Sequence, residues 1–351
     1  MVGLVGPERR PSAPDARTRG TSIEQAVQTV GWRTVGRSDV RIGSLGFGAA
    51  ALGGLYERVE AADAVAVIRR AVDLDVGLID VAPLYGVGLA EQRVGEGLAA
   101  LPAGTALPPI STKVGRVLVD GAAGTTIFAD EAPRHAEFDL SERGIRTSLE
   151  SSLERLGVDR VDLCFLHDPD DREDEALRTA FPAMRRLRDE GVVGAIGAGM
   201  NQAGALERFI GETDIDVVLL AGRWTLLEHD AATRRLLDRC AADGVAVVLG
   251  GVLNTGLLAG GTTYDYVAAP VAVVARRDRL ARVCADHDVD LARAAIRFGL
   301  GHPAVATVLV GARSVAEIET AAAAIREPMP TGLWDDLRDR GLIDDDIPTP
   351  S

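Results

Sequence analysis

The segment SERGIRTSLESSLERLGVDRVDLCFLH, residues 141–167, contains one complete example of the unit from which this chain is built. It begins with Ser141, a residue type that accepts hydrogen bonds at helix N-termini. Apolar side chains then recur at helical spacing, and Gly157 predicts the end of the helix. Residues 161–167 follow as an apolar run that is typical of a strand buried on both faces. The segment therefore predicts a helix followed by a buried strand.

The same alternation extends over most of the chain. Eight apolar runs predict parallel strands: 44–48, 78–82, 109–113, 161–167, 193–200, 217–221, 246–250 and 306–311. Further amphipathic segments predict helices at 61–74, 90–99, 175–190, 203–210, 230–242 and 315–325. Eight such repeats in about 280 residues predict an α/β fold of the (β/α)8 TIM-barrel type.

A doubly wound sheet is the competing architecture. Such folds usually carry a glycine fingerprint after their first strand. Here Gly46-Phe47-Gly48 is followed by alanines where the third glycine would stand, so the barrel is favoured.

The remaining segments complete the expected organisation. Residues 115–138 and 251–270 interrupt the repeat as long loops after the third and seventh strands, and long loops in compact domains are usually functional. Two additional helices are predicted at 273–287 and 291–300, and a C-terminal helical piece at 333–342. Residues 1–30 are rich in Pro, Arg and Gly and predict a disordered extension. Residues 31–351 are thus expected to form a single barrel domain with long loops on its catalytic face.

Composition limits the classes of partner. The net charge of −14 argues against nucleic acid and anionic membranes, which both bind basic surfaces. No apolar stretch reaches the roughly 20 residues that a membrane helix requires. The three cysteines are widely spaced without a CxxC pair, which favours a reducing cytoplasm. The oligomeric state is left open.

Lys113 is the only lysine among 38 basic residues, so the other 37 are arginines. A compact ammonium can pack against an acid or a phenol and exchange protons, whereas a guanidinium is effectively always charged. The isolated lysine therefore indicates a chemical requirement at this position.

Further reactive side chains follow neighbouring predicted strands. Asp80 lies at the end of the second strand and Tyr85 just beyond it, Lys113 ends the third strand, and His167 ends the fourth. The carboxyl ends of barrel strands meet on the catalytic face. Asp80 can pair with Lys113, and Lys113 can favour the phenolate of Tyr85, which becomes a usable acid or base. Neither a GxSxG nucleophile nor an HxH or HExxH metal set occurs, so the set suits proton transfer coupled to hydride transfer.

These residues resemble the catalytic set of the aldo-keto reductases, NAD(P)-dependent barrel oxidoreductases. Residues 80–86, DVAPLYG, with Glu91 and Gly95 behind them, are similar to the second-strand signature of that family. The resemblance implies that Tyr85 is the acid/base, that Lys113 tunes it, that Asp80 holds Lys113, and that His167 orients the substrate.

Several stretches resemble one branch of the family, the sugar 1-dehydrogenases of the D-threo-aldose or L-fucose type and the related pyridoxal 4-dehydrogenase. They are residues 166–169, 197–202, 220–228 and 250–256. The implied reaction is oxidation of the C1 hydroxyl of an aldose to a lactone. Alternatives are an NADPH-dependent aldehyde or ketone reductase of broad specificity and a non-enzymatic cofactor-sensing subunit.

The resemblance also implies the cofactor contacts, although the chain departs from the family pattern at three of them. Met200-Asn201 replaces Ser-Asn, and Ala221 stands where a Gln is expected at the end of the sixth strand. Gly250 stands where an aromatic residue stacks on the nicotinamide, so Trp224 is a candidate to supply the stacking. The expected cofactor residues are Asn201, Gly250, Gly251, Leu253, Asn254, Gly256, Gly311, Arg313 and Glu317.

Two further predictions concern the choice of cofactor and the substrate. The Glu317 carboxylate would repel a 2′-phosphate and favour NAD over NADP, whereas Arg313 has the opposite effect, so both cofactors stay open. Tyr56 and Trp224 are assigned to a small sugar or aldehyde substrate, with a buried loop anchor as the alternative for Trp224. The acidic run at residues 168–175 is interpreted as a solvated loop and not as a metal site.

Overall fold

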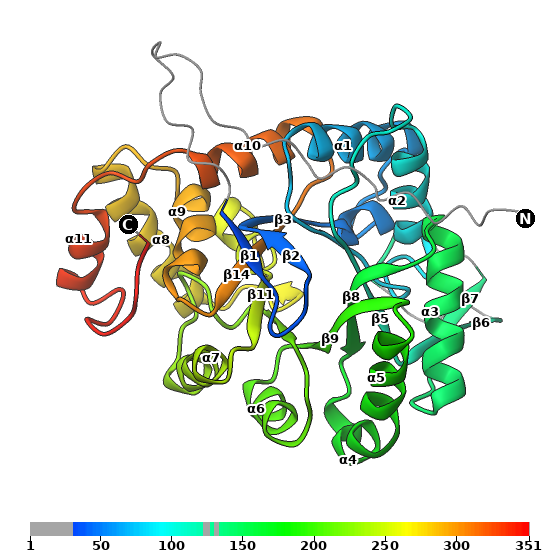
Figure 1. Ribbon diagram of the computed structural model, residues 1–351. Coiled ribbons are helices and arrows are strands. Elements are labelled where there is room, and N and C mark those ends of the chain that lie inside the picture. The colour runs from blue at the N-terminus through cyan, green and yellow to red at the C-terminus, as the bar shows by residue number, and fades with distance from the viewer. Residues whose placement is uncertain (1–30, 122–126, 130–132, 351) are drawn as a thin grey trace, which may run out of the picture.

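The computed structural model describes residues 31–121, 127–129 and 133–350. Within them, eight parallel strands close into one barrel (Figure 1). In barrel order these are β3 (Leu45–Gly48), β4 (Ile79–Asp80), β5 (Ile110–Val114), β8 (Val161–His167), β9 (Val193–Met200), β10 (Val217–Ala221), β11 (Ala246–Gly250) and β14 (Val305–Gly311), which pairs again with β3. The predicted TIM-barrel fold is confirmed, and the doubly wound alternative is excluded because the sheet has no open edge.

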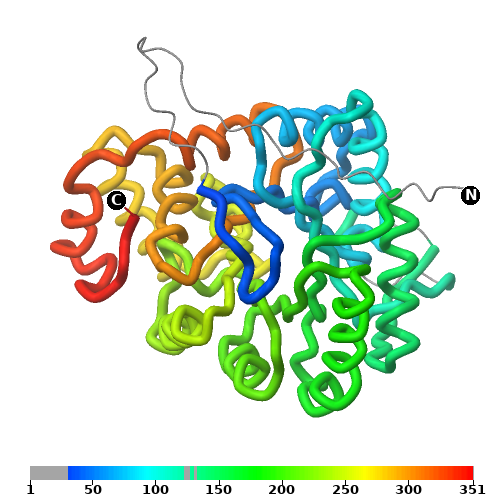
Figure 2. The backbone as a smooth tube through the Cα atoms, in the orientation of Figure 1, coloured from blue at the N-terminus to red at the C-terminus, as the bar shows by residue number. Residues whose placement is uncertain are grey.

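Helices surround the barrel, as the tube in Figure 2 shows. They are α1 (Ala61–Asp73), α2 (Leu89–Ala99), α3 (Glu142–Leu156), α4 (Glu173–Glu175), α5 (Phe181–Asp189), α6 (Ala203–Glu212), α7 (Ala231–Asp243), α8 (Val271–Asp286), α9 (Leu291–Phe298), α10 (Val315–Arg326) and α11 (Leu333–Asp339). Helix α3 starts and ends as its sequence predicts: the Ser141 side chain accepts a hydrogen bond from the Gly144 N–H, and Gly157 ends the helix at φ 68°. These caps satisfy backbone groups that the helix itself leaves unpaired.

A hairpin that the sequence analysis did not predict precedes the barrel. Strands β1 (Trp32–Thr34) and β2 (Arg41–Gly43) pair antiparallel, and Figure 1 shows them in front of the barrel interior. Val35 and Ile42 are fully buried and belong to the same apolar cluster as Leu163 and Phe165 of β8. The hairpin therefore closes one end of the barrel, where the strands begin, and leaves the other end for the site.

The helix predicted at 175–190 is interrupted. A π-helical turn at Ala176–Ala180 lies between α4 and α5 and is followed by Phe181 and Pro182. Proline has no N–H for the hydrogen bond to the preceding turn, and its ring clashes with that turn, so the helix widens locally.

The two long loops contain hairpins of their own. After β5, strands β6 (Arg116–Asp120) and β7 (Arg134–Phe138) pair antiparallel. After β11, the short strands β12 (Thr263–Tyr264) and β13 (Val267–Ala268) do the same. Both loops leave carboxyl ends of barrel strands, so they lie on the side of the barrel that carries the site.

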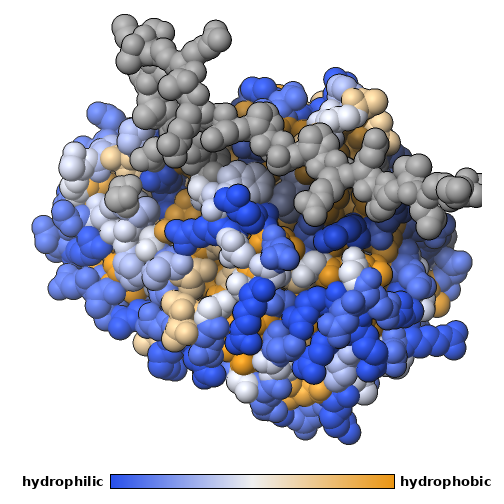
Figure 3. Space-filling model, viewed as in Figure 1, coloured by the Kyte–Doolittle hydropathy of each residue, from blue (hydrophilic) through white to orange (hydrophobic). Residues whose placement is uncertain are grey.

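Hydrophilic side chains cover most of the face shown in Figure 3. None of the helices in the described part of the chain is long and apolar enough to cross a membrane. The extension predicted at residues 1–30 lies outside the described residues.

Candidate active site

The ammonium of Lys113 lies at the centre of the site. Its Nζ is 2.8 Å from Asp80 Oδ2 and donates a second hydrogen bond to the Val81 carbonyl at 3.0 Å. Asp80 Oδ1 accepts a further hydrogen bond from the Ser111 hydroxyl at 2.7 Å. These side chains sit on the adjacent strands β4 and β5, where Asp80 and Ser111 are register partners. The pair that the sequence predicts is therefore formed, and both oxygens of the carboxylate are engaged.

Two of the three N–H groups of Lys113 are used in this way, and the ammonium also lies beside Tyr85. The Nζ is 4.8 Å from the centroid of the Tyr85 ring, and its charge acts on the phenol. Burial alone would lower the pKa of Lys113, but the Asp80 carboxylate and Tyr85 together hold it above its ordinary value. Lys113 is therefore a permanent cation at physiological pH.

The pKa of the Tyr85 phenol is raised, whereas the sequence predicts that Lys113 favours the phenolate. Burial raises the pKa of Tyr85 to about 12, and the nearby Lys113 cation opposes this without overcoming it. The Asp80 carboxylate contributes in the same direction as burial. Lys113 favours the phenolate, as the sequence predicts. Removal of the phenol from water has the larger effect on its pKa, because burial penalises the anion.

His167 completes the set from the end of β8. Its ring lies edge-on to Tyr85, with ring centroids 6.0 Å apart. Burial lowers the pKa of His167 well below its usual value, and the cations Lys113 and Arg116 lower it further. The imidazole is therefore neutral and has one N–H donor and one nitrogen acceptor.

A buried acid behind β5 supports this arrangement. Glu91 of α2 is fully buried, accepts a hydrogen bond from Thr112 at 2.7 Å, and pairs with Arg155 of α3 at 2.7 Å. Thr112 is adjacent to Lys113, so the network holds the strand that carries the lysine. A buried carboxylate is stable only when it is paired in this way.

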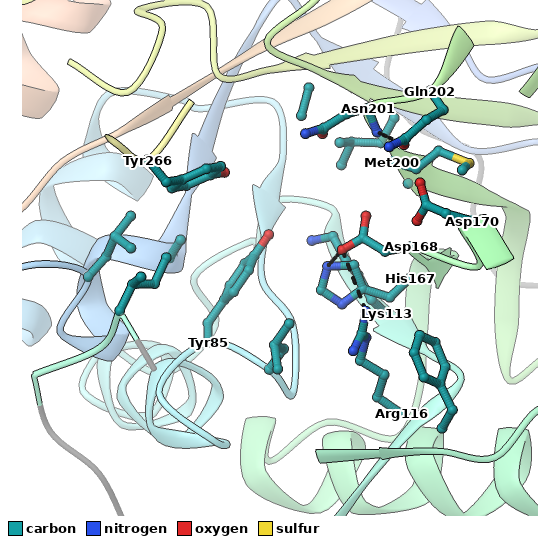
Figure 4. A pocket seen from close by; sticks show the side chains of 18 of the residues that line it. Tyr85, Lys113, Arg116, His167, Asp168, Asp170, Met200, Asn201, Gln202 and Tyr266 are labelled. Carbon is teal, nitrogen blue, oxygen red and sulfur yellow. Dashed lines mark hydrogen bonds and ion pairs between the residues drawn. The ribbon is translucent and has the colours of Figure 1, made fainter. Parts of the chain in front are cut away.

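Tyr85, Lys113 and His167 line a cavity of about 950 Å³ (Figure 4). Arg116, Asp168, Asp170 and Asn201 also line it, and Tyr266 extends over it from the turn between β12 and β13. The volume falls at the upper end of the range for small-molecule sites.

The residues assigned to the cofactor lie on neighbouring strand ends. Gly250 ends β11 and is followed by Gly251, Leu253, Asn254 and Gly256. Gly311 ends β14, which pairs with β11, and is followed by Arg313 and Glu317. Asn201 lies at the end of β9 and lines the cavity. Leu253 differs from the rest because its side chain packs against the apolar core.

One observation tests whether a dinucleotide fits here. The Asn254 side chain is buried, and neither its Nδ2 nor its Oδ1 has a hydrogen-bond partner among the described residues. A buried amide without partners is costly, so a ligand that supplies an acceptor and a donor would stabilise it. Gly251 at φ 62° and Gly256 at φ 88° turn the backbone around this amide. The loop thus fits a polar ligand such as a dinucleotide.

The charges at the start of α10 are paired. Arg313 forms ion pairs with Glu57 at 2.6 Å and with Glu317 at 3.6 Å, and its backbone N–H donates to Glu317. The guanidinium therefore faces two carboxylates, and this group of three side chains has a net negative charge.

Of the two residues assigned to the substrate, only Tyr56 is accessible, with 44 % of its surface exposed. Trp224 is 1 % exposed and packs against Phe298, with ring centroids 6.0 Å apart. The ring is enclosed by the protein and does not line the cavity, so its assignment as a substrate or nicotinamide platform stays a prediction. The alternative, a buried loop anchor, agrees with the structure.

Three residues outside the predicted site also line the cavity: Asp168, Arg116 and Tyr266. Asp168 belongs to the run interpreted as a solvated loop, and Arg116 lies in the long loop after the third strand, from which the sequence allows a contact with substrate. Proximity of Asp168 to His167 in the chain was the one available signal. Tyr266 gave none, because its hairpin has neither Gly nor Asn in the turn.

Comparisons with known proteins agree with this geometry. Residues 44–339 match the sequence model of the Aldo/keto reductase family. D-threo-aldose 1-dehydrogenase from Pseudomonas sp is 39 % identical over 322 residues, covering 88 % of this chain and 96 % of that protein. Pyridoxal 4-dehydrogenase from Microbacterium luteolum is 34 % identical over 337 residues, and the match covers 89 % of this chain and 97 % of that protein.

Among solved structures, the glycerol dehydrogenase from Gluconobacter oxydans superposes with a TM-score of 0.71. It is 22 % identical, and the match covers 92 % of this chain and 100 % of that one. At this identity the likeness shows the fold alone.

Proposed function

For this chain, which belongs to the aldo/keto reductase family and is an oxidoreductase, we propose a specific reaction. It oxidises the C1 hydroxyl of an aldose to a lactone with a nicotinamide cofactor. The observation that carries the proposal is the Tyr85 phenol, which lies beside the buried Lys113–Asp80 pair and lines a cavity of about 950 Å³. The similarity to a D-threo-aldose 1-dehydrogenase supports a sugar as the substrate.

The chain's own residues would divide the work as follows. Tyr85 would exchange the proton with the reacting oxygen, and the neighbouring Lys113 ammonium would stabilise the phenolate that forms. The neutral His167 would hold that oxygen by a hydrogen bond and so orient the carbon that reacts. A bound nicotinamide would accept the hydride from that carbon. Asn201 and Asn254 would hold the cofactor.

We further propose that NAD is preferred over NADP. The two carboxylates around Arg313 already satisfy its charge, so a 2′-phosphate would meet net negative charge at the start of α10. A ribose hydroxyl would find acceptors there.

Reduction of aldehydes with NADPH is the second candidate. One observation favours it: a phenol with a pKa of about 12 is protonated at physiological pH and is therefore ready to donate a proton to a carbonyl oxygen.

Absorbance at 340 nm separates the two. Initial rates are measured with NAD and then NADP against L-fucose, D-arabinose, L-galactose and pyridoxal, and with NADH and NADPH against a simple aromatic aldehyde. We expect at least one of the sugars to reduce NAD. Silence with every sugar, together with NADPH consumption by the aldehyde, would replace the proposal by the second candidate.

A further inference from the structure

Asp168 has an unusual backbone for a residue at the edge of an active site. It follows His167 directly and has φ 44°, in the left-handed region that side chains other than Gly, Asn and Asp rarely adopt. Its N–H donates to the Gly199 carbonyl at 3.0 Å, which joins the end of β8 to β9. This conformation turns the carboxylate into the cavity beside the His167 ring (Figure 4).

The Asp168 carboxylate lies at ion-pair distance from Arg116 but accepts no hydrogen bond from Arg116 or from His167. Its Oδ2 lies 3.8 Å from Arg116 Nη2 and 3.6 Å from His167 Nε2, both beyond hydrogen-bond length. His167 is neutral, so it adds no charge attraction. Arg116 is in addition stacked over the Phe138 ring, 4.1 Å from its centroid. The carboxylate, with its side chain 38 % exposed, thus retains acceptor capacity on the cavity side.

Burial raises the pKa of Asp168, and the Arg116 cation opposes this. A carboxylate that is partly removed from water and accepts no hydrogen bond is stabilised when a ligand hydroxyl donates one.

Tyr266 lines the same cavity as this carboxylate and the Tyr85 phenol, and Figure 4 shows its ring pointing into that cavity. It stands at φ 66° beside Asp265 at φ 46°, so two successive left-handed residues form the turn between β12 and β13. Such turns normally use Gly or Asn, and a bulky residue there is retained only where the surroundings hold it. The Tyr266 side chain is 53 % exposed and lines the cavity.

The turn is held in place by both of its neighbours. Asp265 pairs with Arg223 at 3.0 Å, and the Tyr264 hydroxyl donates to Glu228 at 2.8 Å. Both partners lie in the loop after β10. The aromatic ring is therefore positioned by the protein before any ligand arrives, which lowers the entropy that binding would cost.

We infer that Asp168 and Tyr266 form a two-sided subsite for a neutral polyhydroxylated ring, in which Asp168 accepts hydrogen bonds from hydroxyls away from the reacting carbon and the Tyr266 ring covers the apolar C–H face. The inference rests on the proposed function and deepens it, because it names what distinguishes a sugar from a plain aldehyde in this cavity. Asp168 and Tyr266 act as specificity residues and take no part in proton or hydride transfer.

The test for Asp168 compares two substrate classes in one variant. Asp168→Asn keeps the shape and the left-handed backbone but removes the charge. We expect kcat/KM for the preferred aldose to fall about 10- to 100-fold, the range of a hydrogen bond to a charged group, mainly through KM. For a benzaldehyde-type substrate without hydroxyls the loss is expected to be several-fold smaller. Asp159→Asn is the matched control, since it removes the same charge from an exposed position before the other end of β8.

The ring of Tyr266 is tested by a second pair. Tyr266→Phe keeps the ring and is expected to keep the aldose KM within about threefold, whereas Tyr266→Ala should raise it about 10-fold. Val267→Ala, at the exposed neighbouring position, is the control for disturbance of the hairpin.

The outcomes separate this inference from the proposed function. A wild-type enzyme that reduces aldehydes but oxidises none of the aldoses overturns the proposed function, and the subsite with it. A wild-type enzyme that oxidises aldoses, combined with an Asp168→Asn variant that loses nothing or loses both substrate classes equally, overturns the subsite alone.

Discussion

Residue identity determines the chemistry of the site at the positions of Asp80, Tyr85, Lys113 and His167. Lys113 is 1 % exposed and bonded to Asp80 and Val81, so the single lysine of the chain occupies a position where a larger cation has no room. The ionisation of Tyr85 could not be predicted in the same way. Its pKa depends on how much water the surrounding loops exclude, and that is a property of the folded chain.

Tyr85→Phe removes the hydroxyl and leaves the ring. We expect kcat to fall by about 10²- to 10⁴-fold, the usual contribution of a general acid or base, while cofactor affinity measured by fluorescence titration stays within about threefold. A variant that keeps most of its activity would exclude Tyr85 as the proton-transfer residue.

Lys113→Arg keeps the charge and changes its shape. The planar guanidinium cannot fit between Asp80 and Tyr85 as the ammonium does, so we expect kcat to fall at least about 100-fold. The reverse exchange Arg146→Lys, at an exposed ion pair with Glu190, is the control and should leave kcat unchanged. Near-normal turnover in Lys113→Arg would reduce the isolated lysine to a coincidence of composition.

Glu317→Arg replaces one of the two carboxylates around Arg313 by a cation. We expect the ratio of kcat/KM with NADP to that with NAD to rise at least about 10-fold. The new guanidinium can pair with a 2′-phosphate, and the carboxylate that repels this phosphate is removed. Glu319→Arg, two residues further along α10 and paired with Arg70, is the control. An unchanged ratio would show that the adenosine end binds elsewhere.

At the scale of elements, long apolar runs and capped helices were predictable, and short hairpins were not. Strand β8 and helix α3 have the bounds that their sequence predicts. Strands of two or three residues, such as β1, β2, β12 and β13, are too short to show a periodicity. They are stable only because other parts of the chain cover them. The turn between β12 and β13, which places Tyr266 at the cavity, could therefore not be predicted from the sequence.

Ser141→Ala tests the cap of α3. The Ser141 side chain accepts from the Gly144 N–H at 3.1 Å, and its loss should lower the free energy of unfolding by about 1 kcal/mol. Ser151→Ala, inside the same helix, should be neutral or slightly stabilising because alanine has the higher helix propensity. Denaturant titration of both variants measures the difference, and equal stabilities would mean that the cap contributes nothing.

At the scale of the whole molecule, burial of histidines makes stability depend on pH. Burial lowers the pKa of His167, His229 and His302, in the first case with help from Lys113 and Arg116. Below a pH of about 6.5 these histidines therefore bind protons in the unfolded chain but stay neutral in the folded chain. The free energy of unfolding falls as the pH decreases. The loss begins at the ordinary histidine pKa and continues down to the lowered values.

Calorimetry between pH 7.5 and 5 tests this coupling. Each histidine contributes at most about 1.4 kcal/mol per pH unit below its ordinary pKa. His302→Gln, remote from the cavity, should make the Tm decrease less steeply with falling pH than in the wild type. A Tm that stays constant from pH 7 to 5 would contradict the burial of these neutral rings.

The sequence by itself determined the barrel, the bounds of most of its strands and helices, and which four side chains stand at neighbouring strand ends. It could do so because these features depend on local periodicity and on residue type. Only the tertiary structure decided that Trp224 is enclosed, that Tyr85 stays protonated, that Arg313 is neutralised by Glu57, and that Asp168 and Tyr266 face one cavity. Each of these depends on the distance between segments far apart in the chain, and burial and electrostatic energies change with that distance.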